Sequence, residues 1–116
     1  MFKINPNPTF NAAVGLSIPG AQTAGAIDVT FKHKGRAALA EWVKKPSAQA
    51  VEGLSLSDAD YLGEVVSGWA GVKADDGSEV AYSPASLATL LENYPASGAE
   101  IFDAYLKALT EAKAKN

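Results

Sequence analysis

The 116-residue sequence has no cysteine, a single histidine and no long apolar run. Without cysteine, the chain forms neither disulfides nor thiolate metal sites, and it has no cysteine nucleophile. No segment approaches the roughly 20 apolar residues that a transmembrane helix needs, and the N-terminal MFKINPNPTF contains prolines where a secretion signal has its apolar core. We therefore expect a cytoplasmic protein without a membrane partner, held together by packing.

Basic residues are few as well. Ten lysines and arginines stand against 13 aspartates and glutamates, which gives a formal net charge of -3. Nucleic-acid-binding proteins usually carry a basic face that displaces counterions from phosphates. The ten glycines are dispersed, and they form neither G-x-x-x-x-G-K-[ST] nor a strand-borne G-x-G-x-x-G. These absences argue against a nucleic-acid partner and against a nucleotide cofactor.

The overall composition is that of a soluble globular protein, with 47% hydrophobic and 20% charged residues. A chain of this length buries one core and not two. We expect a single domain over residues 1–116, with flexible ends at 1–8 and 111–116. The lysine-rich TEAKAKN at the C-terminus has lost the apolar periodicity that precedes it.

Two stretches near the N-terminus show the alternation of a β-strand. Large apolar residues alternate with small or polar ones over residues 10–18, and again over 27–32. The intervening PGAQTAGA, residues 19–26, has the composition of a loop. The pattern predicts an N-terminal antiparallel β-hairpin, and a hairpin is marginal in water unless another element covers its apolar face.

Four later segments have apolar residues at helical spacing. The first follows Gly35 and ends at Lys44-Lys45-Pro46, and the second begins at Ser57-Asp58-Ala59-Asp60, a cap followed by first-turn acids. The third begins at Ser83-Pro84, and the last at Ser97-Gly98-Ala99-Glu100, which matches a capping box. The apolar stripes are Leu39, Trp42 and Val43; Leu62, Val65, Val66 and Trp69; Leu87, Leu90, Leu91 and Tyr94; and Ile101, Phe102, Tyr105, Leu106 and Leu109.

A smaller hairpin is expected between the second and third of these helices. Asp76-Gly77 lies between Val72 and the pair Val80 and Tyr82, and both turn residues tolerate the positive φ of tight turns. The sequence therefore predicts an α+β fold, mostly α-helical, with about four helices, an N-terminal β-hairpin and a small second hairpin near residues 71–82.

The residues that could carry chemistry all have structural explanations. His33 is the only histidine, so a triad or a histidine metal site would need partners from elsewhere in the chain. Asp58 and Asp60 could be paired carboxylates, but they occupy a helix N-terminus, where the dipole favours acids. Asp75 and Asp76 suit a turn and lack the spacing of an EF-hand. We expect no catalytic, metal-binding or cofactor-binding residues, and no enzyme activity.

Aromatic residues offer candidates for protein contacts. Gly68-Trp69-Ala70-Gly71 could stack a ligand or anchor a partner, because tryptophan is enriched at interaction hot spots. The alternative is a core role that closes a helix against the small hairpin, and it is favoured because Trp69 continues an apolar stripe. Trp42, Tyr94 and the stripe on the last helix are further candidates that a place in the core explains better.

A family resemblance runs through nearly the whole chain. The sequence resembles the tail assembly chaperones of long-tailed bacteriophages in the order and spacing of its segments. These segments are IPG at 18–20, VTFKHKGRAALAEWV at 29–43, VVSGWAGV at 65–72, the DG turn, YSPASLATLLENYP at 82–95 and a final lysine-rich helix.

The resemblance implies assembly work and no catalysis. Chaperones of this family bind the tape measure protein, a very long and largely helical chain, keep it soluble and help to recruit the major tail protein. The resemblance also implies self-association, action in the host bacterial cytoplasm and absence from the finished virion of a phage or prophage. It further implies a short form ending near a programmed frameshift, at Lys115-Asn116.

Two alternatives to an assembly chaperone remain. A structural tail or head-tail connector protein, retained in the virion, is often of similar size and carries a loop that folds on assembly, a part that PGAQTAGA could play. An enzyme or enzyme inhibitor has the weakest support, since no catalytic residues are evident.

Overall fold

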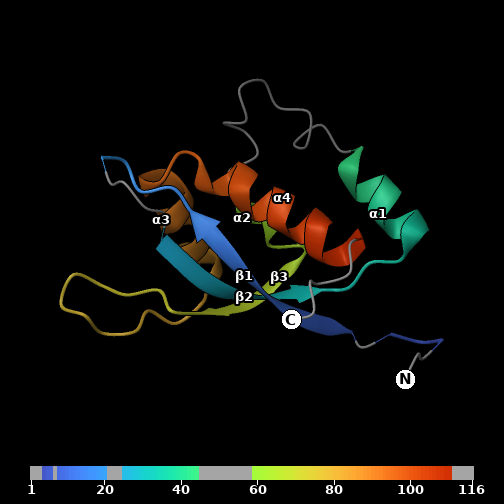
Figure 1. The fold of residues 1–116 in the computed structure, drawn as a ribbon, viewed down its shortest axis with the longest axis horizontal. Coiled ribbons are helices and arrows are strands. Elements are labelled where there is room, and N and C mark those ends of the chain that lie inside the picture. Colours follow the sequence, from blue (N-terminus) through green and yellow to red (C-terminus); the bar gives the residue numbers. More distant parts are fainter. Residues whose placement is uncertain (1–3, 7, 21–24, 45–58, 111–116) are drawn as a thin grey trace.

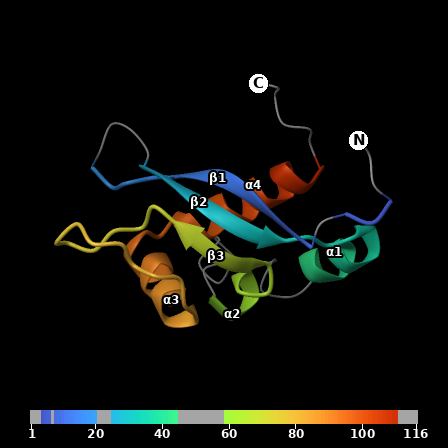
Figure 2. The ribbon, with the colours of Figure 1, turned by 90° about the horizontal axis from the view of Figure 1, so that it is seen from below.

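The computed structural model describes residues 4–6, 8–20, 25–44 and 59–110. Along this part of the chain the elements are β1 (Thr9–Leu16), β2 (Gly25–Lys32), α1 (Arg36–Val43), α2 (Ala59–Leu62), β3 (Val66–Ala70), α3 (Pro84–Asn93) and α4 (Ser97–Thr110). The strands form one antiparallel sheet in the order β1-β2-β3. The long helix α4 crosses one face of the sheet, while α1 and α3 lie at opposite ends of the molecule (Figures 1 and 2).

The predicted N-terminal hairpin is confirmed. β1 and β2 pair without a break from Thr9↔Lys32 to Leu16↔Gly25. Burial alternates along both strands, as the sequence pattern requires. The apolar face of the hairpin packs against α4, so the cover that a two-stranded hairpin needs comes from the last helix. Residues 21–24 of the predicted loop lie outside the described residues.

The centre of the core is aromatic. Trp42 stacks on Tyr61 with ring centroids 4.4 Å apart, and its ring meets Tyr105 edge-on at 5.4 Å. Tyr105 in turn contacts Phe31, at 5.0 Å. Each buried tyrosine hydroxyl has a partner: Tyr61 donates to the carbonyl of Trp42 (2.9 Å), and Tyr105 to that of Lys32 (2.8 Å). These rings are buried without an unpaired hydroxyl, so this end of the sheet has a closely packed aromatic core.

The prediction of about four helices is wrong, although the fold is α+β. The described residues contain three helices of eight residues or more, α1, α3 and α4, together with the single turn α2. The predicted second helix ends at Leu62, and residues 66–70 form β3 instead. Leu62, Val65 and Val66 are buried in either conformation, so the apolar stripe did not distinguish them. The β-branched Val65-Val66 pair and the nearby glycines, together with the open edge of β2, favour the strand.

The predicted cap at the start of α3 is confirmed, and the predicted capping box at the start of α4 is wrong. The Ser83 hydroxyl accepts from the backbone N–H of Ser86 (3.0 Å), and Pro84 occupies the first turn of α3, as predicted. The capping box at Ser97 and Glu100 does not form. Ser97 donates its hydroxyl to the carbonyl of Tyr94 (2.7 Å), and Glu100 binds Ser17 at the end of β1. A tertiary partner has therefore displaced the local one.

Candidate functional site

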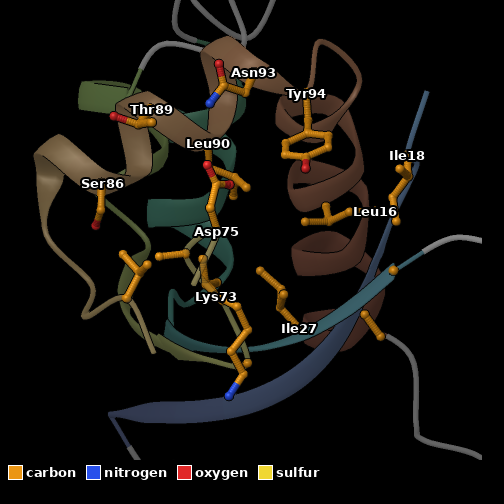
Figure 3. Close-up of a pocket in the computed structure, with 16 residues that line it drawn as sticks. Leu16, Ile18, Ile27, Lys73, Asp75, Ser86, Thr89, Leu90, Asn93 and Tyr94 are labelled. Atoms are coloured by element: carbon orange, nitrogen blue, oxygen red, sulfur yellow. The ribbon is translucent and has the colours of Figure 1, made fainter. Parts of the chain in front are cut away.

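An open groove lies at the end of the molecule opposite the aromatic cluster, between the hairpin, the segment 71–80 and α3 (Figure 3). Its volume is about 720 Å³, within the range of ligand-binding clefts. The groove is lined by Leu16, Ile18, Gly25, Ala26, Ile27, Gly71, Val72, Lys73, Ala74, Asp75, Val80, Ser86, Thr89, Leu90, Asn93 and Tyr94.

The floor of the groove is apolar. Leu16 and Ile27 continue the core to its surface, while Val72, Leu90 and Tyr94 are only half-buried. Ile18, at the rim, is 41% exposed. The chain's own elements thus leave a set of apolar side chains in partial contact with solvent, and these side chains can accept an apolar partner.

Along α3 the groove is lined by the polar, uncharged residues Ser86, Thr89 and Asn93 (Figure 3). On the opposite wall Lys73 and Asp75 carry charge. The ammonium of Lys73 lies 3.1 Å from the Glu79 carboxylate, and both side chains are more than half exposed. Because both partners are exposed, this ion pair contributes little to the stability of the wall.

The wall at 71–80 is the predicted second hairpin, reduced to a tight turn. It has one isolated bridge, Lys73↔Glu79, and no strands of its own. Gly77 has φ +87, and its N–H donates to the carbonyl of Ala74 (2.9 Å). Such a turn with glycine in the left-handed region is the usual three-residue hairpin connection. The Asp76 carboxylate accepts from the hydroxyl and N–H of Ser78, and these hydrogen bonds lower the pKa of Asp76.

A second set of hydrogen bonds ties this turn to the sheet. The Glu79 carboxylate accepts from the N–H of Gly71 (2.8 Å), and this bond, followed by those from Lys73, lowers the pKa of Glu79. The indole N–H of Trp69 donates to the carbonyl of Val80 (2.8 Å), and its ring meets Tyr82 edge-on at 5.2 Å. Trp69 thus packs against the groove wall from strand β3, and the predicted helix that it was expected to close does not extend this far.

The polar candidates do not assemble into a chemical site in the part of the chain that the structure describes. No three of its histidine, aspartate and glutamate side chains lie close enough to hold a metal ion. His33 ends the hairpin, where its backbone N–H donates to the carbonyl of Pro8 (2.9 Å). Asp75 and Asp76 belong to the turn, as predicted. Asp58 and the side chain of Asp60 lie outside the described part.

The aromatic contact candidates have different positions. Trp42 is 1% exposed and belongs to the core, and in α4 Ile101 and Tyr105 are buried. Tyr94 is the candidate that reaches the groove (Figure 3). The groove as a whole was missed by sequence reasoning because its lining comes from three separate segments. The signal present in the sequence was the DG turn followed directly by the stripe of α3.

In the described residues, no helix is long and apolar enough to cross a membrane.

Comparisons with known proteins agree with the resemblance seen in the sequence. No curated protein and no solved structure matches the chain. A protein family described as phage tail assembly chaperone matches residues 1–116, the whole chain. The chain therefore belongs to the phage tail assembly chaperone family.

Proposed function

We propose that the groove binds an amphipathic helical segment of the phage tape measure protein and keeps that protein soluble before tail assembly. The observation that carries this proposal is the apolar lining of the groove, which the described elements leave uncovered beside an exposed Ile18. An amphipathic helix laying its apolar face into a hydrophobic groove is a recurrent mode of peptide recognition. Membership of a tail assembly chaperone family supports a client of this kind.

The same proposal includes the rest of the assembly role. The chaperone acts in the host cytoplasm without catalysis, helps to recruit the major tail protein, associates with itself and is absent from the mature virion. One groove covers only a short part of a long client, so several copies are needed along it. Linked copies bind with an avidity that a single groove lacks, and each contact remains reversible when the tail protein displaces it.

Co-expression with the tape measure protein of the same phage tests the groove. We expect the wild-type chaperone to raise the soluble yield of the tape measure protein and to co-purify with it. Thr89→Glu places a charge at the rim of the groove and should weaken both effects, because a bound client helix would bury that carboxylate against its apolar face. Ala88→Glu is the matched control, since it adds the same charge to an exposed position of the same helix outside the lining.

Three results would count against the proposal. If the wild-type protein changes neither yield nor co-purification, client binding is wrong. If Ala88→Glu is as damaging as Thr89→Glu, the groove is not the binding surface. Mass spectrometry of purified virions addresses the remaining alternative, because abundant copies in mature tails would indicate a structural component.

A further inference from the structure

Within the described residues no strand pairs with the outer edge of β1, and the hydrogen bonds of the sheet show which backbone groups face outward. His33 donates its backbone N–H to Pro8 (2.9 Å), and Lys32 donates to Val65 (2.7 Å). Backbone groups of an antiparallel strand alternate between its two sides, so the even-numbered residues of β1 bond to β2. The odd-numbered residues then direct their N–H and C=O groups away from the sheet. These four outward residues, all exposed, are Thr9, Asn11, Ala13 and Gly15.

A hydrogen bond defines one end of this open stretch. The N–H of Ser17, the next outward group, is already taken by the Glu100 carboxylate, at 2.9 and 3.1 Å. The four outward residues before it are placed symmetrically about Ala12. A strand with that symmetry can pair with an identical strand running the opposite way, and every outward N–H then meets a carbonyl.

The devices that normally protect an edge strand are missing from β1. Natural edges are short, bulged, or carry charged residues and proline. β1 has eight residues in unbroken register with β2, and the sequence has no charged residue from 4 to 27. The other edge strand, β3, has five residues, and its pairing with β2 shifts between Thr30 and Phe31.

One exposed apolar side chain lies just before β1 in the sequence. Within the described residues, the exposed large apolar side chains are Ile4, at 91%, and Ile18, at 41%. Ile18 lies beside Gly25 of β2 and lines the groove, whereas Ile4 precedes β1. A partner strand that runs along β1 in the opposite direction would extend toward Ile4, and burial of that side chain would add to the hydrogen bonds of the edge.

We propose that β1 pairs antiparallel with β1 of a second copy of this chain, so that two three-stranded sheets join into one. Ala12 lies on the two-fold axis, Thr9 faces Gly15 of the second copy, and Asn11 faces Ala13. Each pair sets a small side chain against another residue without a clash, and no charge opposes a like charge. Two copies with a net charge of -3 each repel one another, and this uncharged strand is the place where they can meet at least cost.

The inference deepens the self-association that belongs to the proposed function, by naming its surface. Its test uses the isolated protein, so client binding and dimerisation can fail separately. Sedimentation velocity over a wide range of concentration should show a monomer–dimer equilibrium for the wild type. Ala13→Lys places like charges near the two-fold axis, and we expect the dissociation constant to rise by at least about tenfold.

Ala70→Lys is the matched control, because it adds the same residue at an exposed alanine of β3 and should leave the equilibrium unchanged. A wild-type protein that stays monomeric at all concentrations overturns the proposal. So does an Ala70→Lys variant that dissociates as readily as Ala13→Lys. Circular dichroism checks that both variants fold.

Hydrogen exchange locates the contact without relying on a charge. The amides of Asn11 and Ala13 should exchange more slowly as the protein concentration rises, while those of Ala12 and Val14, bonded within the sheet, stay protected throughout. Ala13→Pro removes one outward N–H and none of the β1–β2 bonds, so it should weaken the dimer in a folded protein. A dimer whose Asn11 and Ala13 amides remain unprotected would place the contact elsewhere and overturn the proposal.

Discussion

The two ends of the β1–β2 hairpin differ in how their apolar side chains are covered. Where β1 begins and β2 ends, Phe10 and Phe31 face each other and join the aromatic cluster around Trp42. Where β1 ends and β2 begins, aliphatic Leu16 and Ile27 run into an open groove. Close packing at one end supplies stability, which leaves the other end free to keep apolar side chains in reach of a partner. The following predictions test this division.

The largest expected effect is at the aromatic end. Trp42→Ala should lower the free energy of unfolding by about 3–5 kcal/mol, because it removes a fully buried indole that contacts three other rings. Leu90→Ala, in the half-buried groove floor, should cost only about 1–2 kcal/mol. Urea denaturation measures both. Equal losses would remove the contrast between the ends.

Alkaline pH should also act through the aromatic end. Burial, aided for Tyr61 by nearby Glu64, raises the pKa of Tyr61 and Tyr105 from 10.0 to about 12. The unfolded chain therefore loses these protons first, so the stability they provide is complete below pH 10 and is lost as the pH rises toward 12. We expect the urea midpoint to fall across that window. The decline should be shallower in Tyr61→Phe, and a midpoint that does not change above pH 10 would contradict the assignment.

A smaller effect is expected at the groove wall. Gly77 has φ +87 with open space around it, so Gly77→Ala should cost about 1 kcal/mol through backbone strain alone. Gly77→Asn should cost less, because asparagine tolerates the left-handed region. Thermal unfolding compares the two variants. If alanine and asparagine are equally tolerated, the wall is not held by this turn.

The smallest effect on stability should come from the groove variants themselves. Thr89→Glu and Ala88→Glu alter exposed positions of α3, and each should change the free energy of unfolding by no more than about 0.5 kcal/mol. A client-binding defect in Thr89→Glu would then be a property of the surface. A large loss of stability in either variant would show that the groove end is more tightly coupled to the fold than its exposure indicates.

Local patterns predicted the elements whose stabilising contacts are local. Alternation over residues 10–18 and 27–32 identified the hairpin, and Ser83-Pro84 identified the start of α3, since caps and pleats act on neighbouring residues. β3 was missed because the spacing of Leu62, Val65 and Val66 fits a buried helix as well as a buried strand after a turn. The strand forms because β2 offers unpaired backbone groups on the side away from β1, and β3 pairs with them.

The site was less predictable than the fold for a related reason. Glu100 has the spacing of a capping box with Ser97, yet a strand 83 residues earlier in the sequence offers it a better partner. The groove likewise combines Leu16, Val72 and Leu90, which only the folded chain brings together. The expectation of one domain with flexible ends, and that of no catalytic residues, stay predictions.

The bond between Glu100 and Ser17 has a consequence for biosynthesis. β1 and β2 leave the ribosome early, but the helix that covers their apolar face is the last described element to be made. During most of translation the nascent hairpin therefore exposes its apolar face to solvent, and the backbone N–H of Ser17 has not yet met its Glu100 partner. Packing of the hairpin against α4 must therefore wait until the end of that helix, Thr110, has emerged.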